Sequence, residues 1–378
     1  MYRILKIGMD VHTTNFTLCA LESKFGEEDV VLANITVEPD HKNVLDFIRR
    51  IKEKMDPRGN DKIDVECGYE AGCLGYCLYH QLTDRNVNCV ILAPTTMLEQ
   101  RSKKRIKTDK RDAEIIGRCL AQHNYSPVHV PTAGDEETKE FLRMRSDHKL
   151  ALKKVKQQIL AFCLRHNYRY EGKSNWTDIH LKWLRSLKLE SLYKEILDEY
   201  LMTYNVLSEK IERLDMRIEE LAREDKYRES VKKLCCFIGV KTHIALSVLV
   251  EVGDFNRFAT AEKFASYIGL VPGESSSGDD QVKLGITKAG NRHLRILLTE
   301  AAQCYGRSKT GYKSKDLKAR QLGNPPQVIA YADKANDRLR RRFYKMVLGK
   351  NKKHNVAKVA IARELACFMW GMMTDNIA

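Results

Sequence analysis

The chain has 378 residues and 43% of them are hydrophobic, enough to bury at least one full core and in keeping with two or three. Lys and Arg number 65 and Asp and Glu 50, so the formal net charge is +15. This basic balance favours a polyanionic partner, nucleic acid above all, over a cationic surface that serves only solubility. The many acidic residues exclude a histone-like tail and leave room for a site built from carboxylates.

Neither the hydropathy nor the cysteine pattern indicates a membrane, secreted or zinc-binding protein. No apolar stretch is long enough to span a bilayer, and the opening residues lack the apolar core of a signal peptide. The eleven cysteines include no CxxC pair, although Cys73 and Cys77 are four apart and Cys235 and Cys236 are adjacent. We therefore expect a cytoplasmic, nucleoid-associated protein with reduced, mostly buried thiols.

Residues 1–127 alternate strand and helix signals, which predicts an α/β domain. Three consecutive strands come first, and helices and strands then alternate. We expect strands at Arg3–Asp10, Phe16–Leu21, Val30–Val37, Ile63–Tyr69 and Asn88–Leu92, and helices around Val44–Ile51, after Gly72 and from about Arg111. This order is typical of an RNase H-like core, a mixed sheet flanked by helices.

Residues 128–228 are predicted to be helical and highly charged. Apolar residues follow one another at alternating spacings of three and four, which is the seam of a coiled coil. The longest seam consists of Leu197, Tyr200, Tyr204, Leu207, Ile211, Leu214, Ile218 and Leu221. The partner helix would come from the same chain or from another copy. An ordinary amphipathic helix packed on a globular body is the alternative.

Residues 229–378 are predicted to form an all-α domain. A turn at 238–242 between two helical patterns resembles a helix-hairpin-helix, whose backbone N–H groups can bind a DNA phosphate. A loop is expected at 272–280, where three consecutive serines precede Gly278, Asp279 and Asp280. A further helix begins near Gly290, and the last one, 357–372, should pack on the fold. Basic residues expected to contact nucleic acid are Lys288, Arg292, Arg295, Arg338, Arg340, Arg341 and Arg342.

Four acidic residues of the first domain are candidate metal ligands. Asp10 and Glu70 each close an apolar strand, where an acid has no capping role. Asp109 and Asp112 stand three apart at the start of a helix, so they share one face, although acids are also favoured there by the helix dipole. Carboxylates that converge at one sheet edge repel one another unless a cation lies between them. Hard oxygen ligands select Mg²⁺ or Mn²⁺, and two such ions can hold both oxygens of a phosphodiester exchange.

Several segments in the same order resemble the DEDD-type insertion-sequence transposases of the IS110 family. In the first half these are residues 7–12 (IGMDVH), 69–72 (YEAG) and 107–113 (KTDKRDA). In the second half they are residues 269–272 (GLVP), 276–278 (SSG) and 285–295 (GITKAGNRHLR). Each motif alone is weak, but the ordered set spans nearly the whole chain and is specific.

The resemblance implies a DNA recombinase with a RuvC-like domain whose acids Asp10, Glu70, Asp109 and Asp112 bind Mg²⁺. It also implies a serine nucleophile, for which Ser277 is the best match and Ser276 the close alternative. Members of the family act as tetramers with a structured bridge RNA that pairs with donor and target DNA, so we expect an RNA partner and a homo-oligomer, from dimer to tetramer.

Two other functions remain possible from the sequence. A hydrolytic junction resolvase would use only the four acids and water, without a covalent intermediate. A non-catalytic nucleic-acid scaffold would need only the coiled coil and the basic C-terminal part. The serine segment and the basic helix after it favour the recombinase over the resolvase, and the four acids argue against the scaffold. Asp279 and Asp280 depart from the expected pattern: beside the nucleophile they would either weaken phosphate approach or merely face solvent, and the sequence leaves both open.

Overall fold

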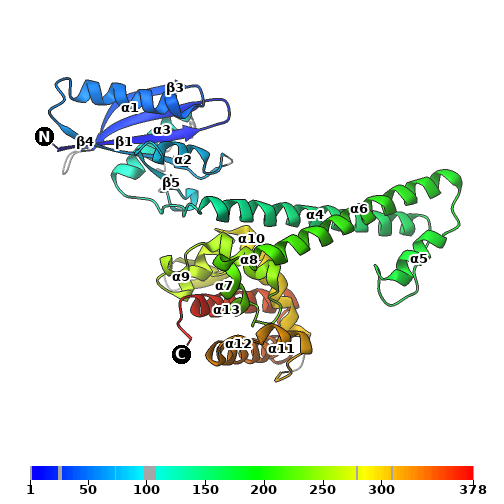
Figure 1. Cartoon of the computed structure of the whole chain (residues 1–378). Coiled ribbons are helices and arrows are strands. Elements are labelled where there is room, and N and C mark those ends of the chain that lie inside the picture. The colour runs from blue at the N-terminus through cyan, green and yellow to red at the C-terminus, as the bar shows by residue number, and fades with distance from the viewer. Residues whose placement is uncertain are drawn as a thin grey trace. The chain divides into compact units, whose positions relative to one another are not determined.

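The computed structural model divides the chain into two compact units, Met1–Val130 and Pro131–Ala378 (Figure 1). It describes residues 2–23, 28–72, 74–97, 108–277, 280–307 and 310–377. The predicted division into three parts, 1–127, 128–228 and 229–378, stays a prediction. Because the two units are not placed relative to one another, each is described by itself.

The first unit is built on a five-stranded mixed sheet. Its strands are β1 (Tyr2–Val11), β2 (Phe16–Ser23), β3 (Val30–Val37), β4 (Lys62–Glu70) and β5 (Asn88–Leu92). The strand order is β3-β2-β1-β4-β5, in which β1, β2 and β3 pair antiparallel and β4 and β5 join β1 in parallel. The predicted α/β domain is therefore confirmed, with strand bounds close to those expected, because long apolar runs end at polar turns.

Helices cover both faces of this sheet. They are α1 (His41–Met55), α2 (Cys77–Thr83) and α3 (Asp109–Ala121), with a 3₁₀ turn at Pro94–Thr96. The side chain of Asp40 caps α1 by accepting from the Lys42 N–H, and the apolar stripe of α1 packs with α2 over one face. On the other face α3 buries Ala113, Ile116 and Leu120. The two faces alternate along β1, since Ile7 and Met9 share a core with α1 whereas Gly8 meets the backbone of α3.

The second unit begins with three helices, α4 (Ala133–Arg165), α5 (Asp178–Ser186) and α6 (Ser191–Leu221). Helix α6 packs along α4 within the same chain (Figure 1). At one end the predicted seams meet, since Val155, Ile159 and Phe162 of α4 form one core with Leu197 of α6 and Leu184 of α5. The helical prediction is confirmed, whereas supercoiling of this helix pair stays a prediction.

The remaining helices of the second unit form a larger core. They are α7 (Asp225–Leu234), α8 (Thr242–Val252), α9 (Ala261–Tyr267), α10 (Arg292–Ala302), α11 (Lys315–Gln321), α12 (Pro326–Tyr344) and α13 (His354–Met373), with short turns at Phe255–Arg257, Gln303–Gly306 and Lys345–Gly349. The mostly apolar α13 packs against α9, α10 and α12, as expected for a central helix. Between α7 and α8, Gly239 adopts φ 79° where a Cβ would lie 2.3 Å from the Ala301 carbonyl oxygen.

The loop predicted for the serine segment, residues 272–280, is wrong. Residues Pro272–Ser277 form strand β6, which pairs antiparallel with β7 (Asp280–Ile286). The C-terminal domain is therefore not all-α. Serine and glycine predict a loop by composition, but apolar and polar residues alternate from Gln281 to Leu284, which is the period of a strand. Gly278 and Asp279 lie outside the described residues.

No helix in the described part of the chain is long and apolar enough to cross a membrane. The ten cysteines that the structure describes are all free thiols, and most are buried. The eleventh, Cys73, lies outside the described residues.

Candidate active site

The ends of strands β1 and β4 place two of the predicted acids side by side. The strands are parallel and Met9 pairs with Tyr69, so the next residues, Asp10 and Glu70, are neighbours in the register. Asp10 is partly buried and Glu70 is exposed. Both therefore stand at the carboxyl edge of the sheet, where open α/β folds bind their ligands.

Helix α3 brings a third acid to this edge because it packs unusually close to β1. A Cβ on Gly8 would lie 2.1 Å from the carbonyl oxygen of Ala113 and 2.3 Å from the backbone nitrogen of Gly117. Only glycine permits this approach of helix backbone to strand backbone. Gly8 and Asp10 lie on the same face of β1, because side chains alternate along a strand. The first turn of α3, which contains Asp109 and Asp112, is thereby held beside the end of β1.

Asp10, His12 and Asp109 form a group that could hold a metal ion. Their ligand atoms all lie within 4.8 Å of one another. The His12 Nε2 lies 3.2 Å from the Asp10 Oδ2. This group does not include Glu70 or Asp112, which stand nearby on β4 and in the first turn of α3. His12 was not predicted as a site residue, although it stands two positions after Asp10 in the first motif.

The electrostatics of Asp10 fit a cation at this point. Burial raises the pKa of the Asp10 carboxyl above its ordinary value, the charges of Asp109 and Asp112 raise it further, and His12 opposes them. A partly buried carboxylate that faces two more carboxylates is stabilised by a divalent cation bound between them. The oxygen-rich donor set suits Mg²⁺ or Mn²⁺, and one imidazole is also compatible with Mn²⁺.

The candidate serines lie on the hairpin of the second unit. In the backbone register Ser276 pairs with Gln281 and Ser277 with Asp280. Ser277 is therefore the last residue of β6. Of the two acids that departed from the expected pattern, Asp280 begins β7 and Asp279 lies outside the described residues.

The basic residues before and within α10 differ in their surroundings. Lys288 and Arg292 are exposed, and Lys288 adopts a left-handed backbone conformation with φ 57°. The Arg295 guanidinium donates a 2.7 Å hydrogen bond to the Ile268 carbonyl and helps to hold α10 in place. Lys288 and Arg292 are thus the better placed of the three to meet a phosphate.

The arginine cluster of α12 does not form one basic face. Arg340 is 4% exposed and donates to the Tyr312 carbonyl, so it is poorly placed for its predicted contact with nucleic acid. Arg338 and Arg342 both pair with Glu364 of α13, at 2.5 and 2.9 Å. Arg341 is exposed. Neighbours in sequence on a helix point in different directions, and for this reason the cluster divides between core and surface.

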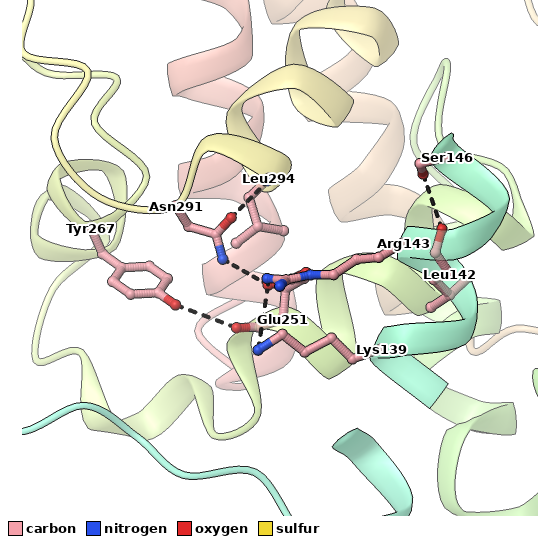
Figure 2. A network of polar contacts seen from close by, with 8 residues as sticks. All are labelled: Lys139, Leu142, Arg143, Ser146, Glu251, Tyr267, Asn291 and Leu294. Carbon is pink, nitrogen blue, oxygen red and sulfur yellow. Dashed lines mark hydrogen bonds and ion pairs between the residues drawn. The ribbon is translucent and has the colours of Figure 1, made fainter. Parts of the chain in front are cut away.

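A buried carboxylate in the second unit was also missed from the sequence. Glu251 of α8 is surrounded by residues from α4 and from the start of α10 (Figure 2). The available signal was its position, since it is the one charged residue in the apolar run 244–252. A charge in such a helix is buried only when it has partners.

A mixed sheet with acids at its carboxyl edge, followed by a long helical part, fits the RNase H-like class of transposases. Two family profiles match the chain. The DEDD transposase family matches residues 7–167, and the family described as "Transposase IS116/IS110/IS902 family" matches residues 231–318.

Individual relatives agree with these profiles. A protein of Sinorhizobium fredii, named as a candidate transposase, is 32% identical over 99% of this chain and 90% of its own length. The transposase for an insertion sequence element of Leptospira borgpetersenii is 32% identical over 91% of this chain and 96% of its own. A pilin gene-inverting protein of Moraxella lacunata is 28% identical over 51% of this chain and 52% of its own.

The chain belongs to the IS110 family of DEDD transposases. It is an enzyme of DNA transposition, and its family implies the use of a divalent metal ion.

Proposed function

We propose that this transposase cuts and rejoins DNA with Mg²⁺, or Mn²⁺, held by Asp10, Glu70, Asp109 and Asp112. The convergence of Asp10 and Asp109, whose carboxylate oxygens lie within 4.8 Å of each other and of His12, carries this proposal. The bound ions would polarise the phosphate and stabilise the charge on the attacking and leaving oxygens. His12, which touches Asp10, orients that carboxylate toward the ion.

The strand exchange itself would use Ser277, with Ser276 as the alternative nucleophile. Attack of the serine Oγ on a DNA phosphate forms a serine–phosphate ester and breaks the bond to one deoxyribose oxygen. The serine proton ends on that leaving oxygen as a hydroxyl group. The hydroxyl of a second strand then attacks the ester, restores the serine and rejoins the DNA. The position of Ser277 at the end of β6 supports this assignment.

The start of α10 is the proposed phosphate site of the second unit. Lys288 and Arg292 are exposed there, and the first N–H groups of the helix carry the positive end of its dipole. Arg341 could add a contact to the backbone of a nucleic acid elsewhere on the surface. Contacts of this kind hold a nucleic acid in register without reading its sequence.

The partners would be donor and target DNA together with a structured bridge RNA. The net charge of +15 supports binding of these polyanions. Base pairing by the RNA would select the target, and the protein would recognise shape and backbone. We also propose that the active form is a homo-oligomer, from dimer to tetramer, in the cytoplasm and beside the nucleoid.

Substitution of the acids tests this function. A plasmid that carries the gene with its genomic flanks is assayed for transposition with Asp10→Asn or Glu70→Gln. Each change removes one metal-ligating charge, so we expect transposition to fall by about 100-fold or more. Asp64→Asn, on the same strand as Glu70 but bonded to Tyr2, is the matched control and should retain activity. Undiminished transposition in Asp10→Asn would exclude the proposed metal site.

A further inference from the structure

The carboxylate of Glu251 is the centre of a buried polar network in the second unit. Its side chain is 1% exposed and lies one residue before the end of α8. Arg143 of α4 forms two hydrogen bonds with it, at 2.8 and 3.1 Å, and the Lys139 Nζ lies 3.9 Å away. The Asn291 side-chain amide donates a third hydrogen bond, of 2.8 Å (Figure 2).

The network keeps Glu251 negatively charged. Burial alone would raise its pKa, but the hydrogen bonds from Arg143 and Asn291 and the charge of Lys139 bring the pKa below its ordinary value. A buried ion cluster of this kind contributes little net stability compared with apolar packing. What it adds is a fixed geometry, because each of its hydrogen bonds has a preferred direction.

Asn291 links this network to the backbone of α10. Its side-chain oxygen accepts the N–H of Leu294 at 3.0 Å and so caps the helix, while its amide group donates to Glu251. Its own N–H donates to the Tyr267 carbonyl, and the Tyr267 hydroxyl donates to the Glu251 carbonyl. One asparagine therefore joins the first turn of α10 to α8 and, through Glu251, to α4.

The same connection reaches the serine hairpin. Between the end of β7 and α10, the N–H of Thr287 donates to Val271 and the N–H of Lys288 to Gly269. Gly290, at φ 95°, lies so close to Tyr267 that a Cβ would be 2.0 Å from its carbonyl oxygen. The segment between hairpin and helix is thus fixed at both of its ends.

We propose that Glu251 is a positioning residue for recombination, which sets the start of α10 and the adjoining end of the serine hairpin relative to α4. Helix α4 begins at Ala133, three residues after the acid-bearing unit ends at Val130. Glu251 therefore ties the helix that follows the proposed metal site to the segment that follows the proposed nucleophile. The inference rests on the proposed function of that hairpin and of Lys288 and Arg292.

Substitutions at Asn291 separate positioning from simple capping. Asn291→Ser keeps a good N-cap but cannot hold Glu251, whereas Asn291→Asp keeps the cap and places two carboxylates together. In the double variant Glu251→Gln with Asn291→Asp the hydrogen bond returns with donor and acceptor exchanged. Hydrogen exchange of the 292–297 amides in the full chain is measured with transposition from the plasmid described above.

If Glu251 positions α10, Asn291→Ser and Asn291→Asp should each speed hydrogen exchange at 292–297 by about ten-fold and lower transposition by about ten-fold. Changes of this size are expected when a charge-assisted hydrogen bond is lost. The double variant should recover much of the slow exchange at 292–297 and much of the transposition. Asp215→Asn is the control, because it breaks the Arg145–Asp215 pair between α4 and α6 without touching α10. It should leave exchange at 292–297 unchanged.

Two results would overturn the inference. One is Asn291→Ser with exchange and transposition equal to those of the wild type, which would leave only a capping role. The other is a double variant no better than Asn291→Asp alone. If the serines prove dispensable for transposition, the proposed function fails instead, and the exchange result still reports on Glu251.

Discussion

His243, in the first turn of α8, shows how strongly one half-buried residue responds to its surroundings. Burial lowers the pKa of its imidazole to about 3, and the nearby charges of Arg145 and Lys149 and the ring of His293 act in the same direction, against Asp215. Its Nε2 has no hydrogen-bond partner among the described residues. The folded protein therefore holds this ring neutral, whereas the unfolded chain protonates it near pH 6.5.

The stability of the second unit should consequently fall as the pH is lowered from about 6.5 toward 3. In that range the unfolded chain binds a proton at His243 and the folded protein does not, which costs at most about 1.4 kcal/mol per pH unit. We expect His243→Gln to lose less unfolding free energy than the wild type when urea denaturation is compared at pH 7 and pH 4.5. His354→Gln, at an exposed histidine of α13, is the control. Equal losses in wild type and His243→Gln would contradict this explanation.

At the scale of elements, the contact between β1 and α3 decides where the acids meet. The two glycines at this contact differ in what an added methyl group would touch. On Gly8 it would strike the backbone of α3, whereas on Gly117 it would strike the Leu21 Cδ1 at 2.1 Å. A leucine side chain can rotate away, but a helix backbone must shift as a whole.

Gly8→Ala should therefore be more damaging than Gly117→Ala. We expect Gly8→Ala to lower the free energy of unfolding of the first unit by about 1–3 kcal/mol and to weaken Mn²⁺ binding, because α3 moves Asp109 away from Asp10. Gly117→Ala should lower the free energy of unfolding by less and retain Mn²⁺ binding. Chemical denaturation and Mn²⁺ titration measure the two effects. If Gly117→Ala loses as much unfolding free energy and Mn²⁺ binding as Gly8→Ala, the contact between Gly8 and the α3 backbone does not decide where the acids meet.

The sequence predicts elements better than it predicts contacts between them. The strands of the first unit could be placed almost to the residue, because apolar runs and polar turns are local signals. Strand β6 could not, because serine and glycine favour loops and its pairing with β7 supplies what composition lacks. The partner of Glu251 lies 108 positions away, on Arg143, and no local pattern indicates such a pair.

The same limit applies to the candidate site. Asp10 and Glu70 are identifiable in the sequence as acids at strand ends. Asp109 is distinguished from an ordinary acid at the start of a helix only by its motif. His12 was overlooked because its role depends on where the Asp10 side chain points. A contact of Arg340 with nucleic acid is expected from the run of arginines, but such a run does not reveal which arginine faces the core.

At the scale of the whole molecule, the transposase carries its two proposed reactive groups in different units of the chain. The acids belong to Met1–Val130 and the serines to Pro131–Ala378. Recombination through a covalent intermediate needs both, whereas a hydrolytic nuclease needs only the acids. The serine is therefore the feature that separates the two reactions.

The most direct measurement is to map the DNA-linked peptide after reaction of the full chain with its own element, DNA and RNA. We expect a covalent adduct on the peptide that contains Ser277, absent in Ser277→Ala and in Asp10→Asn. A link that moves to Ser276 would select the alternative nucleophile. An adduct that persists when both serines are replaced, or metal-dependent cleavage with no adduct at all, would contradict the serine mechanism.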